Sequence, residues 1–216
     1  MKAKDNRTYL SGVCLITDRD SCSLTCLEMT LIALKAGVRW IQYRDKTKSR
    51  LGIYRLARRL RELTWDFGAC FIVNDHVDIA ASVDADGVHL GQDDLPLKEA
   101  RKILGKDKVI GISTHSLSEA IKAEAEGADY IGFGPVFPTK TKDAGDPKGV
   151  QMLCKVRNKV NIPIIAIGGI NLDNVDSVLA SGVDAVAAAS AILKGDIYCN
   201  AGGLLQKVQR YKKGVN

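Results

Sequence analysis

The chain of 216 residues is 46% hydrophobic and 26% charged, with a formal net charge of +6. This length can build one large hydrophobic core, and the composition is that of an ordinary soluble globular protein. No apolar run approaches the roughly 20 residues of a membrane span, and the polar start MKAKDNRTYL lacks the apolar centre of a secretory signal, so we expect a cytoplasmic protein that does not bind membranes.

Short apolar runs rich in β-branched residues recur along the chain, at residues 13–17, 40–44, 70–74, 87–90, 109–113, 130–134, 163–168 and 185–190. Segments with helical periodicity, such as 27–37 and 118–127, lie between them. Most of the expected strands are apolar on both faces, as a parallel sheet covered by helices requires. The pattern predicts a single-domain (β/α)₈ TIM barrel over residues 1–216, with a doubly wound open sheet as the alternative.

The junctions between these segments also repeat. Gly37, Gly127 and Gly182 each stand where a helix is expected to end, one or two residues before the next strand, and glycine suits the left-handed turn that closes a helix. Ser116 with Glu119 has the spacing of a capping box, and Asn171 is placed to cap the following helix.

The positive net charge raises the question of nucleic-acid binding. The basic residues are spread out, and their densest cluster, at residues 54–65, has the spacing of a solvated helix face. No set of aromatic residues accompanies this cluster to stack bases. We therefore expect no nucleic-acid partner, and an anionic small substrate fits the charge as well.

The six cysteines could indicate disulfides or a zinc site. Cys22 and Cys26 are close in sequence, but no second pair or histidine cluster completes a tetrahedral site. Cys14 and Cys70 lie inside apolar runs and are typical of small core residues. We predict free thiols.

Polar residues that suit phosphate and metal binding gather after the expected strands. In a TIM barrel the active site lies at the carboxyl ends of the strands. Those ends here carry Thr17-Asp18-Arg19, Gln42 to Lys46, Asn74-Asp75, Gly91 to Asp94, Ser113, residues 134–142, Gly168-Gly169 and Ser190. The opposite ends carry mostly turn glycines and lone charges.

Asp75 and Asp94 have two explanations. Each could cap the helix that follows it, and Pro96 near Asp94 would suit a first helical turn. In a barrel, however, strands three and four are neighbours, so the two carboxylates would lie close at one rim. Two oxygen ligands with room for water and substrate oxygens describe a Mg²⁺ site.

The other candidates also have plain alternatives. Arg44 and Lys46 could be solvated surface charges, and TKTK at residues 139–142 could be a basic loop, although its hydroxyls and lysines suit phosphate oxygens. IGGI before Asn171 could be a tight turn or a glycine turn that presents backbone N–H groups to phosphate. Neither the Walker pattern nor the Gly-x-Gly-x-x-Gly fingerprint is present, which disfavours nucleotide hydrolysis and dinucleotide binding.

The ordered set QYRDK, VNDHVDIA, DGVHLGQDD, GIST, GFGPVFPTKTK, AIGGI and ASAI resembles the thiamine phosphate synthase family, from about Thr17 to Ile192. The combination is more specific than any single motif. Members of that family join a hydroxymethylpyrimidine diphosphate to a thiazole phosphate and release diphosphate. The resemblance implies a transferase of thiamine biosynthesis that uses one Mg²⁺ per subunit and two small-molecule substrates. A homo-oligomer is compatible with the sequence.

The resemblance also assigns site residues. It implies that the pyrimidine diphosphate binds in the segment Gln42, Tyr43, Arg44, Asp45 and Lys46 and to Asn74 and Ser113. Asp75 and Asp94 would bind Mg²⁺. The thiazole phosphate would contact Thr139, Lys140, Thr141, Gly169, Ala189 and Ser190, with Lys142 near the diphosphate. Of these, Lys142, Ser113, Arg44 and Lys46 would take part in catalysis.

Two other functions remain open from the sequence. A thiazole tautomerase-like relative shares the barrel and the phosphate site, and His115 could be its base. It would need neither both aspartates nor Lys46, and this chain has all three. A barrel that only binds thiamine intermediates would keep the phosphate contacts and lose the magnesium ligands.

Overall fold

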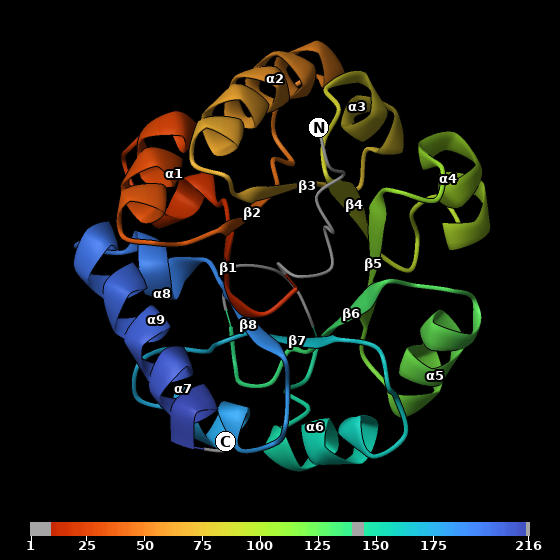
Figure 1. The fold of residues 1–216 in the computed structure, drawn as a ribbon, viewed down its shortest axis with the longest axis vertical. Coiled ribbons are helices and arrows are strands. Elements are labelled where there is room, and N and C mark those ends of the chain that lie inside the picture. The colour runs from red at the N-terminus through yellow and green to blue at the C-terminus, as the bar shows by residue number, and fades with distance from the viewer. Residues whose placement is uncertain (1–9, 140–144, 215–216) are drawn as a thin grey trace.

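The computed structural model describes residues 10–139 and 145–214. Its centre is a closed barrel of parallel strands in chain order (Figure 1). The strands are β1 Gly12–Ile16, β2 Trp40–Tyr43, β3 Cys70–Asn74, β4 Gly87–Leu90, β5 Val109–Thr114, β6 Tyr130–Phe133, β7 Ile164–Ile167 and β8 Ala185–Ala188. The barrel closes because β1 pairs with β8, with Val13 opposite Val186. The predicted TIM barrel is confirmed, and the open sheet is excluded.

Helices surround the barrel in the order of the chain (Figure 1). They are α1 Cys26–Lys35, α2 Arg50–Asp66, α3 Val77–Ser82, α4 Leu97–Leu104, α5 Leu117–Ala125, α6 Val150–Arg157, α7 Val175–Leu179, α8 Ser190–Leu193 and α9 Ile197–Gly214, with a 3-10 turn at Arg19–Ser21. The last helix packs against α1, α7 and α8 and closes the ring. Among the described residues, no helix is both long enough and apolar enough to cross a membrane.

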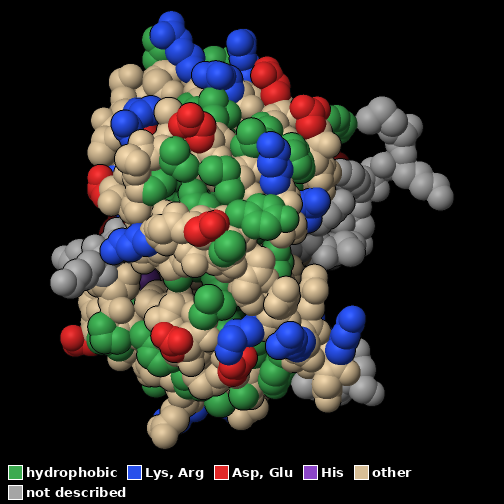
Figure 2. Space-filling model, turned by 90° about the vertical axis from the view of Figure 1, so that its left-hand side faces the viewer, with side chains coloured by type: hydrophobic (Ala, Val, Ile, Leu, Met, Phe, Trp, Pro, Cys, Tyr) green, Lys and Arg blue, Asp and Glu red, His purple; other side chains and the backbone are tan. Residues whose placement is uncertain are grey.

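The basic cluster at residues 54–65 lies on α2, as its spacing predicts. Ile53, Ala57 and Leu60 are buried on one face of this helix, whereas Arg55 and Arg58 are exposed. Figure 2 shows the side of the molecule that lies to the left in Figure 1, where basic and acidic side chains are interspersed among apolar ones. The cluster is therefore the solvated face of an amphipathic helix.

The core has two layers that follow from strand alternation. On β1, Val13 and Leu15 point outward and join the apolar layer between barrel and helices. Cys14 and Ile16 point inward and belong to a smaller cluster inside the barrel, together with Cys70. The prediction that Cys14 and Cys70 are core residues is confirmed, and all six cysteines are free thiols.

The predicted glycine turns are present, because Gly37, Gly127 and Gly182 all have positive φ angles, of 107°, 89° and 83°. The Ser116 side chain accepts the backbone N–H of Glu119, as predicted. The Glu119 carboxylate accepts the backbone N–H of His115 and not that of Ser116, so the second hydrogen bond of the capping box is displaced by one residue.

The prediction that Asn171 caps α7 is wrong. This helix begins at Val175, and its N-cap residue is Asn174. The Asn171 side chain instead accepts the N–H groups of Asp173 and Asn174, at 2.8 and 3.3 Å. It stabilises a turn that precedes the helix, which sequence spacing alone does not distinguish from a cap.

The amino-terminal rim of the barrel carries a repeated ion-pair motif. Asp86, Asp129 and Asp184 come directly before β4, β6 and β8, and each accepts a backbone N–H from the preceding strand at 2.8 Å. Each also binds an arginine from a surrounding helix, in the pairs Arg61–Asp86, Arg101–Asp129 and Arg157–Asp184, with N···O distances of 2.8, 2.5 and 2.9 Å. Charges that stand alone in the sequence at this rim are therefore paired in the fold, with arginines more than 20 residues away in sequence.

Candidate active site

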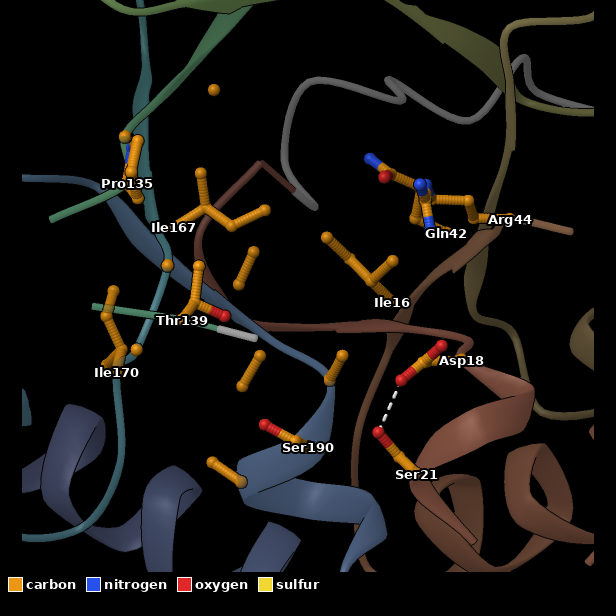
Figure 3. Close-up of a pocket in the computed structure, with 18 of the residues that line it drawn as sticks. Ile16, Asp18, Ser21, Gln42, Arg44, Pro135, Thr139, Ile167, Ile170 and Ser190 are labelled. Carbon is orange, nitrogen blue, oxygen red and sulfur yellow. Dashed lines mark hydrogen bonds between the residues drawn. The ribbon is translucent and has the colours of Figure 1, made fainter. Parts of the chain in front are cut away.

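A cavity of about 640 Å³ opens at the carboxyl ends of the strands, and residues at the ends of all eight strands line it. Figure 3 shows part of its lining. Many of the residues that the sequence analysis selected line this cavity: Gln42, Arg44, Asn74, Ser113, Thr139, Gly169, Ala189 and Ser190. Strand ends that are far apart in sequence thus meet in one space, as the barrel predicts.

The cavity has two polar sides. Gln42 and Arg44 lie on one side in Figure 3, whereas Thr139 and Ser190 lie on the other. The apolar side chains of Ile16 and Ile167 lie between them. This separation matches the two anionic groups that the resemblance implies, one for each substrate.

Thr17 holds the end of β2 in place beside the cavity. Its side chain is buried, and its Oγ1 accepts the Arg44 N–H at 2.9 Å and donates to the Arg44 carbonyl at 3.2 Å. Because the backbone of Arg44 is tied to β1 in this way, the guanidinium projects from a rigid strand end instead of a loose loop.

The local structure at Asp75 excludes the capping explanation. The helix α3 begins at Val77, its N-cap residue is His76, and no side chain caps it. The backbone of Asp75 is left-handed, with φ of 66°, and its N–H donates to the carbonyl of His89 on the next strand at 2.8 Å. A non-glycine residue in this conformation is uncommon, and such residues cluster at functional sites.

Asp94 is also not a helix cap. The helix α4 begins at Leu97 with Pro96 as its N-cap residue, and the Asp94 carboxylate turns back to accept the N–H of Gly91 at 2.6 Å. The prediction that Asp94 could cap this helix is therefore wrong. Its loop folds so that the carboxylate faces the end of β3.

The two aspartates face each other. Burial raises the pKa of the Asp94 carboxyl, and a hydrogen bond and charge repulsion from Asp75 raise it further. The Lys46 ammonium contacts Asp75 at 2.5 Å, and the Asn74 amide also donates to Asp75. A carboxyl whose pKa is raised by a facing carboxylate gains from a bound cation, so Asp94 and Asp75 together are a candidate cation site.

The donor set fits Mg²⁺. Among the described residues, no group of three or more His, Cys, Asp and Glu side chains is placed to hold a metal. A magnesium ion that is completed by substrate oxygens and water does not need such a group, because it commonly uses one or two carboxylates. Asp75 and Asp94 are not themselves among the residues that line the cavity, but Asp75 follows Asn74, which lines the cavity and donates its amide N–H to Asp75.

Three residues of the QYRDK motif do not line the cavity: Tyr43, Asp45 and Lys46. Tyr43 is 1% exposed and packs in the layer between barrel and helices. The Asp45 carboxylate accepts the backbone N–H groups of Thr47 and Lys48 at 3.0 and 3.1 Å, within its own loop. Burial alone would raise the pKa of Asp45, and the bonds from Thr47 and Lys48 outweigh it and lower that pKa. These side chains shape the loop that carries Arg44 and Lys46.

The opposite side of the cavity is built on glycine. Gly168 and Gly169 have φ angles of 97° and 64°. A Cβ atom on Gly169 would lie 2.5 Å from the carbonyl oxygen of Pro138, so the segment after β6 packs directly on this turn. Ala189 and Ser190 begin α8 close by. The predicted residues Lys140, Thr141 and Lys142 lie outside the described residues.

His89 lines the cavity from β4 but is not among the site residues predicted from the sequence. Its neighbours Val88 and Leu90 point outward into the apolar layer, so alternation along the strand directs His89 into the barrel. The alternation of β4 could therefore have identified His89 from the sequence as a residue that faces into the barrel. His115 also lines the cavity and donates its Nδ1–H to the Gly134 carbonyl at 2.7 Å.

Comparison with known proteins now decides the family. The thiamine monophosphate synthase family matches residues 13–192. The chain belongs to this family. It is 49% identical over 184 residues to the thiamine-phosphate synthase of Clostridium novyi, with 84% of this chain and 90% of the relative covered. It is 40% identical over 215 residues to that of Dictyoglomus thermophilum, which covers 99% of this chain and 95% of the relative.

The fold comparison agrees. The solved structure of thiamine phosphate pyrophosphorylase from Pyrococcus furiosus superposes with a TM-score of 0.87 at 39% identity, over 95% of this chain and 98% of that one. The predicted resemblance is confirmed, and with it the transferase activity of thiamine biosynthesis that the resemblance implied.

Proposed function

We propose that the cavity binds a hydroxymethylpyrimidine diphosphate and a thiazole phosphate on its two polar sides and condenses them to thiamine phosphate and diphosphate. The observation that carries this proposal is the pair of facing carboxylates, Asp75 and Asp94, with Lys46 beside them. A tautomerase would need neither both aspartates nor Lys46. A barrel that only binds thiamine intermediates would not keep the two carboxylates together.

The proposed chemistry needs no activated nucleophile. The bond between the pyrimidine methylene carbon and the diphosphate oxygen breaks first, and its electron pair leaves with diphosphate. The ring amine stabilises the resulting cation by resonance. The lone pair of the thiazole nitrogen then forms the new C–N bond, so no proton has to be removed in this step.

The residues on the Arg44 side of the cavity bind the departing diphosphate. Asp75 and Asp94 would hold Mg²⁺, which supplies charge neutralisation for the diphosphate oxygens when it is bound. Arg44 and Lys46 add positive charge at the same side. We propose the same role for Lys142, which lies outside the described residues. Cations placed where negative charge collects stabilise the transition state more than the ground state, by several kcal/mol in total.

The residues on the Ser190 side position the second substrate. Thr139 and Ser190 offer hydroxyl groups, and the turn at Gly169 offers backbone N–H groups to a phosphate. Holding the thiazole by its phosphate brings the nitrogen toward the methylene carbon across the apolar strip of Ile16 and Ile167. Positioning of this kind supplies much of the remaining rate.

The test is to incubate the protein with both substrates and Mg²⁺ and to detect thiamine phosphate by the fluorescence of its oxidation product. Product formation is the expected result, and chelation should abolish it until Mg²⁺ is restored. Absence of product from both substrates and Mg²⁺ would refute the proposed reaction. Full turnover after exhaustive metal removal would refute the metal assignment only.

A further inference from the structure

A chain of polar side chains crosses the inside of the barrel beneath the cavity. Tyr130 Oη lies 2.9 Å from His89 Nδ1, and His89 Nε2 lies 2.8 Å from Ser113 Oγ. The Gln42 side chain lies near the other end and lowers the pKa of Tyr130 slightly against the effect of burial. Gln42, His89 and Ser113 line the cavity, whereas Tyr130 is only 1% exposed. The chain thus links Ser113, a predicted substrate contact, to two residues with no assigned role, His89 and Tyr130.

The barrel makes space for the two rings of this chain. A Cβ atom on Gly111 would lie 2.0 Å from Tyr130 Cζ, and one on Gly132 would lie 3.0 Å from His89 Cε1. The Trp40 ring packs edge-on against Tyr130, with centroids 5.3 Å apart. The rings are therefore held between strands, and their hydrogen-bonding atoms have fixed directions.

The direction of the hydrogen bonds follows from the chemistry of the chain. Burial raises the pKa of Tyr130 well above its usual value, so the phenol keeps its proton. Among the described residues, His89 Nδ1 is the acceptor that lies within hydrogen-bond distance of this buried hydroxyl, at 2.9 Å. The single proton of Tyr130 is then left for His89 Nδ1.

The next two steps are fixed by the imidazole. A neutral imidazole that accepts at Nδ1 carries its own proton on Nε2, and it donates that proton to Ser113 Oγ. The hydroxyl proton of Ser113 is then directed away from His89. Because Ser113 lines the cavity, this proton is available to a substrate acceptor.

We propose that His89 is a positioning residue that, held by Tyr130, fixes the Ser113 hydroxyl as a hydrogen-bond donor toward the pyrimidine diphosphate. The inference rests on the proposed function for the identity of that substrate. A donor at Ser113 meets a ring nitrogen or a diphosphate oxygen, and one of the two lone pairs of its oxygen is already taken by His89. His89 thereby selects which atoms of the substrate Ser113 binds.

A double-mutant cycle tests whether His89 acts through Ser113. His89→Leu and Ser113→Ala should each weaken pyrimidine diphosphate binding by about tenfold, as measured by calorimetry with Mg²⁺, which is the effect of one lost hydrogen bond. The double mutant should bind no more weakly than either single mutant. His89→Gln, which keeps an N–H near the position of Nε2, should recover most of the affinity.

Two measurements keep this test independent of folding. Thiazole phosphate binding and the thermal midpoint should stay unchanged in His89→Gln. Losses that multiply to about a hundredfold in the double mutant would overturn the proposal, as would a His89→Gln variant that binds the pyrimidine diphosphate as weakly as His89→Leu.

The wild-type protein offers a direct test that needs no mutant to fold. In ¹⁵N-histidine spectra of the three histidines, His89 should carry its proton on Nε2 and have an unprotonated Nδ1. The opposite tautomer would overturn the proposed direction. If wild-type protein makes no thiamine phosphate, the proposed function fails, whereas an active enzyme with additive losses in the cycle refutes only the role of His89.

Discussion

The two rims of the barrel both hold acidic side chains that are largely withdrawn from water, but the partners of these carboxylates differ between the rims. At the amino-terminal rim, Asp86 is matched by Arg61 and by a backbone N–H. At the carboxyl-terminal rim, Asp75 and Asp94 face each other, and the cation that contacts Asp75 among the described residues is Lys46, whose side chain is 57% exposed. At the amino-terminal rim each aspartate has its own arginine, whereas at the carboxyl-terminal rim two facing carboxylates share one exposed lysine, so a bound cation would compensate charge that is left over there.

This difference separates stability from function along the barrel axis. A paired and hydrogen-bonded carboxylate stabilises the fold, and its removal leaves a buried cation and N–H without partners. A pair of facing carboxylates destabilises the fold by charge repulsion, and its role is to bind a cation. Substitutions at the two rims should therefore have opposite effects on turnover and on the free energy of unfolding.

The largest effect is expected at Asp75. Asp75→Asn removes one of the two charges that would hold Mg²⁺, so the initial rate with both substrates should fall by about a hundredfold or more, the size of one lost electrostatic contribution at an active site. The free energy of unfolding should stay the same or rise, because the repulsion with Asp94 is relieved. Steady-state kinetics and urea denaturation measure the two quantities.

Binding of each substrate sharpens this prediction. Asp75→Asn should weaken binding of the pyrimidine diphosphate and leave the thiazole phosphate unaffected, whereas Ser190→Ala should do the reverse. Calorimetry with Mg²⁺ present compares the two variants. Equal weakening of both substrates by both variants would show that the cavity does not have two separate sides.

The second prediction concerns the amino-terminal rim. Asp86→Ala should lower the free energy of unfolding by about 3 kcal/mol, since it leaves Arg61 and the N–H of Phe71 without their acceptor. Turnover per folded molecule should be unchanged, because the change lies at the opposite end of the barrel. A loss of turnover without a loss of stability would contradict the division between the rims.

Most of the fold was predictable because each unit repeats the same local signals. Runs that are apolar on both faces indicated parallel strands, and glycines such as Gly37 marked helix ends. The ion pairs of the amino-terminal rim were not predictable, because Arg61 and Asp86 are 25 residues apart and meet only when α2 packs against β3. Sequence spacing carries no information on such a contact before the topology is known.

The site was predictable to the extent that it depends on strand ends. The barrel brought Gln42, Asn74, Ser113 and Ser190 to one cavity as expected. The sequence could not decide whether Asp94 caps a helix, since a cap and a loop carboxylate share the same residue pattern. It also gave no reason to connect His89 with Tyr130, which lie on different strands with β5 between them.

The third prediction uses the raised pKa of Asp94. A carboxyl whose pKa is higher in the folded than in the unfolded protein binds more protons when folded, so stability falls as pH rises from the ordinary carboxyl pKa through the raised value. In the presence of a chelator, Asp94→Asn should therefore have a higher thermal midpoint than wild type near pH 7, and the difference should shrink toward pH 4. Mg²⁺ should raise the midpoint of wild type but not of the variant.

The smallest effect is expected at an ion pair that belongs to neither rim. Glu99 and Lys102 pair on α4 at 2.8 Å, but their side chains are 46% and 62% exposed. Glu99→Gln should change the free energy of unfolding by less than about 0.5 kcal/mol and leave turnover unchanged, because water and salt screen such pairs. The free energies of unfolding of Glu99→Gln and Asp86→Ala should be compared at low and at high salt. Their difference measures how much burial and the backbone N–H add to the stabilisation by an ion pair. If Glu99→Gln were as destabilising as Asp86→Ala, then ion pairing anywhere on the helices would stabilise the barrel equally, and the amino-terminal rim would have no special role.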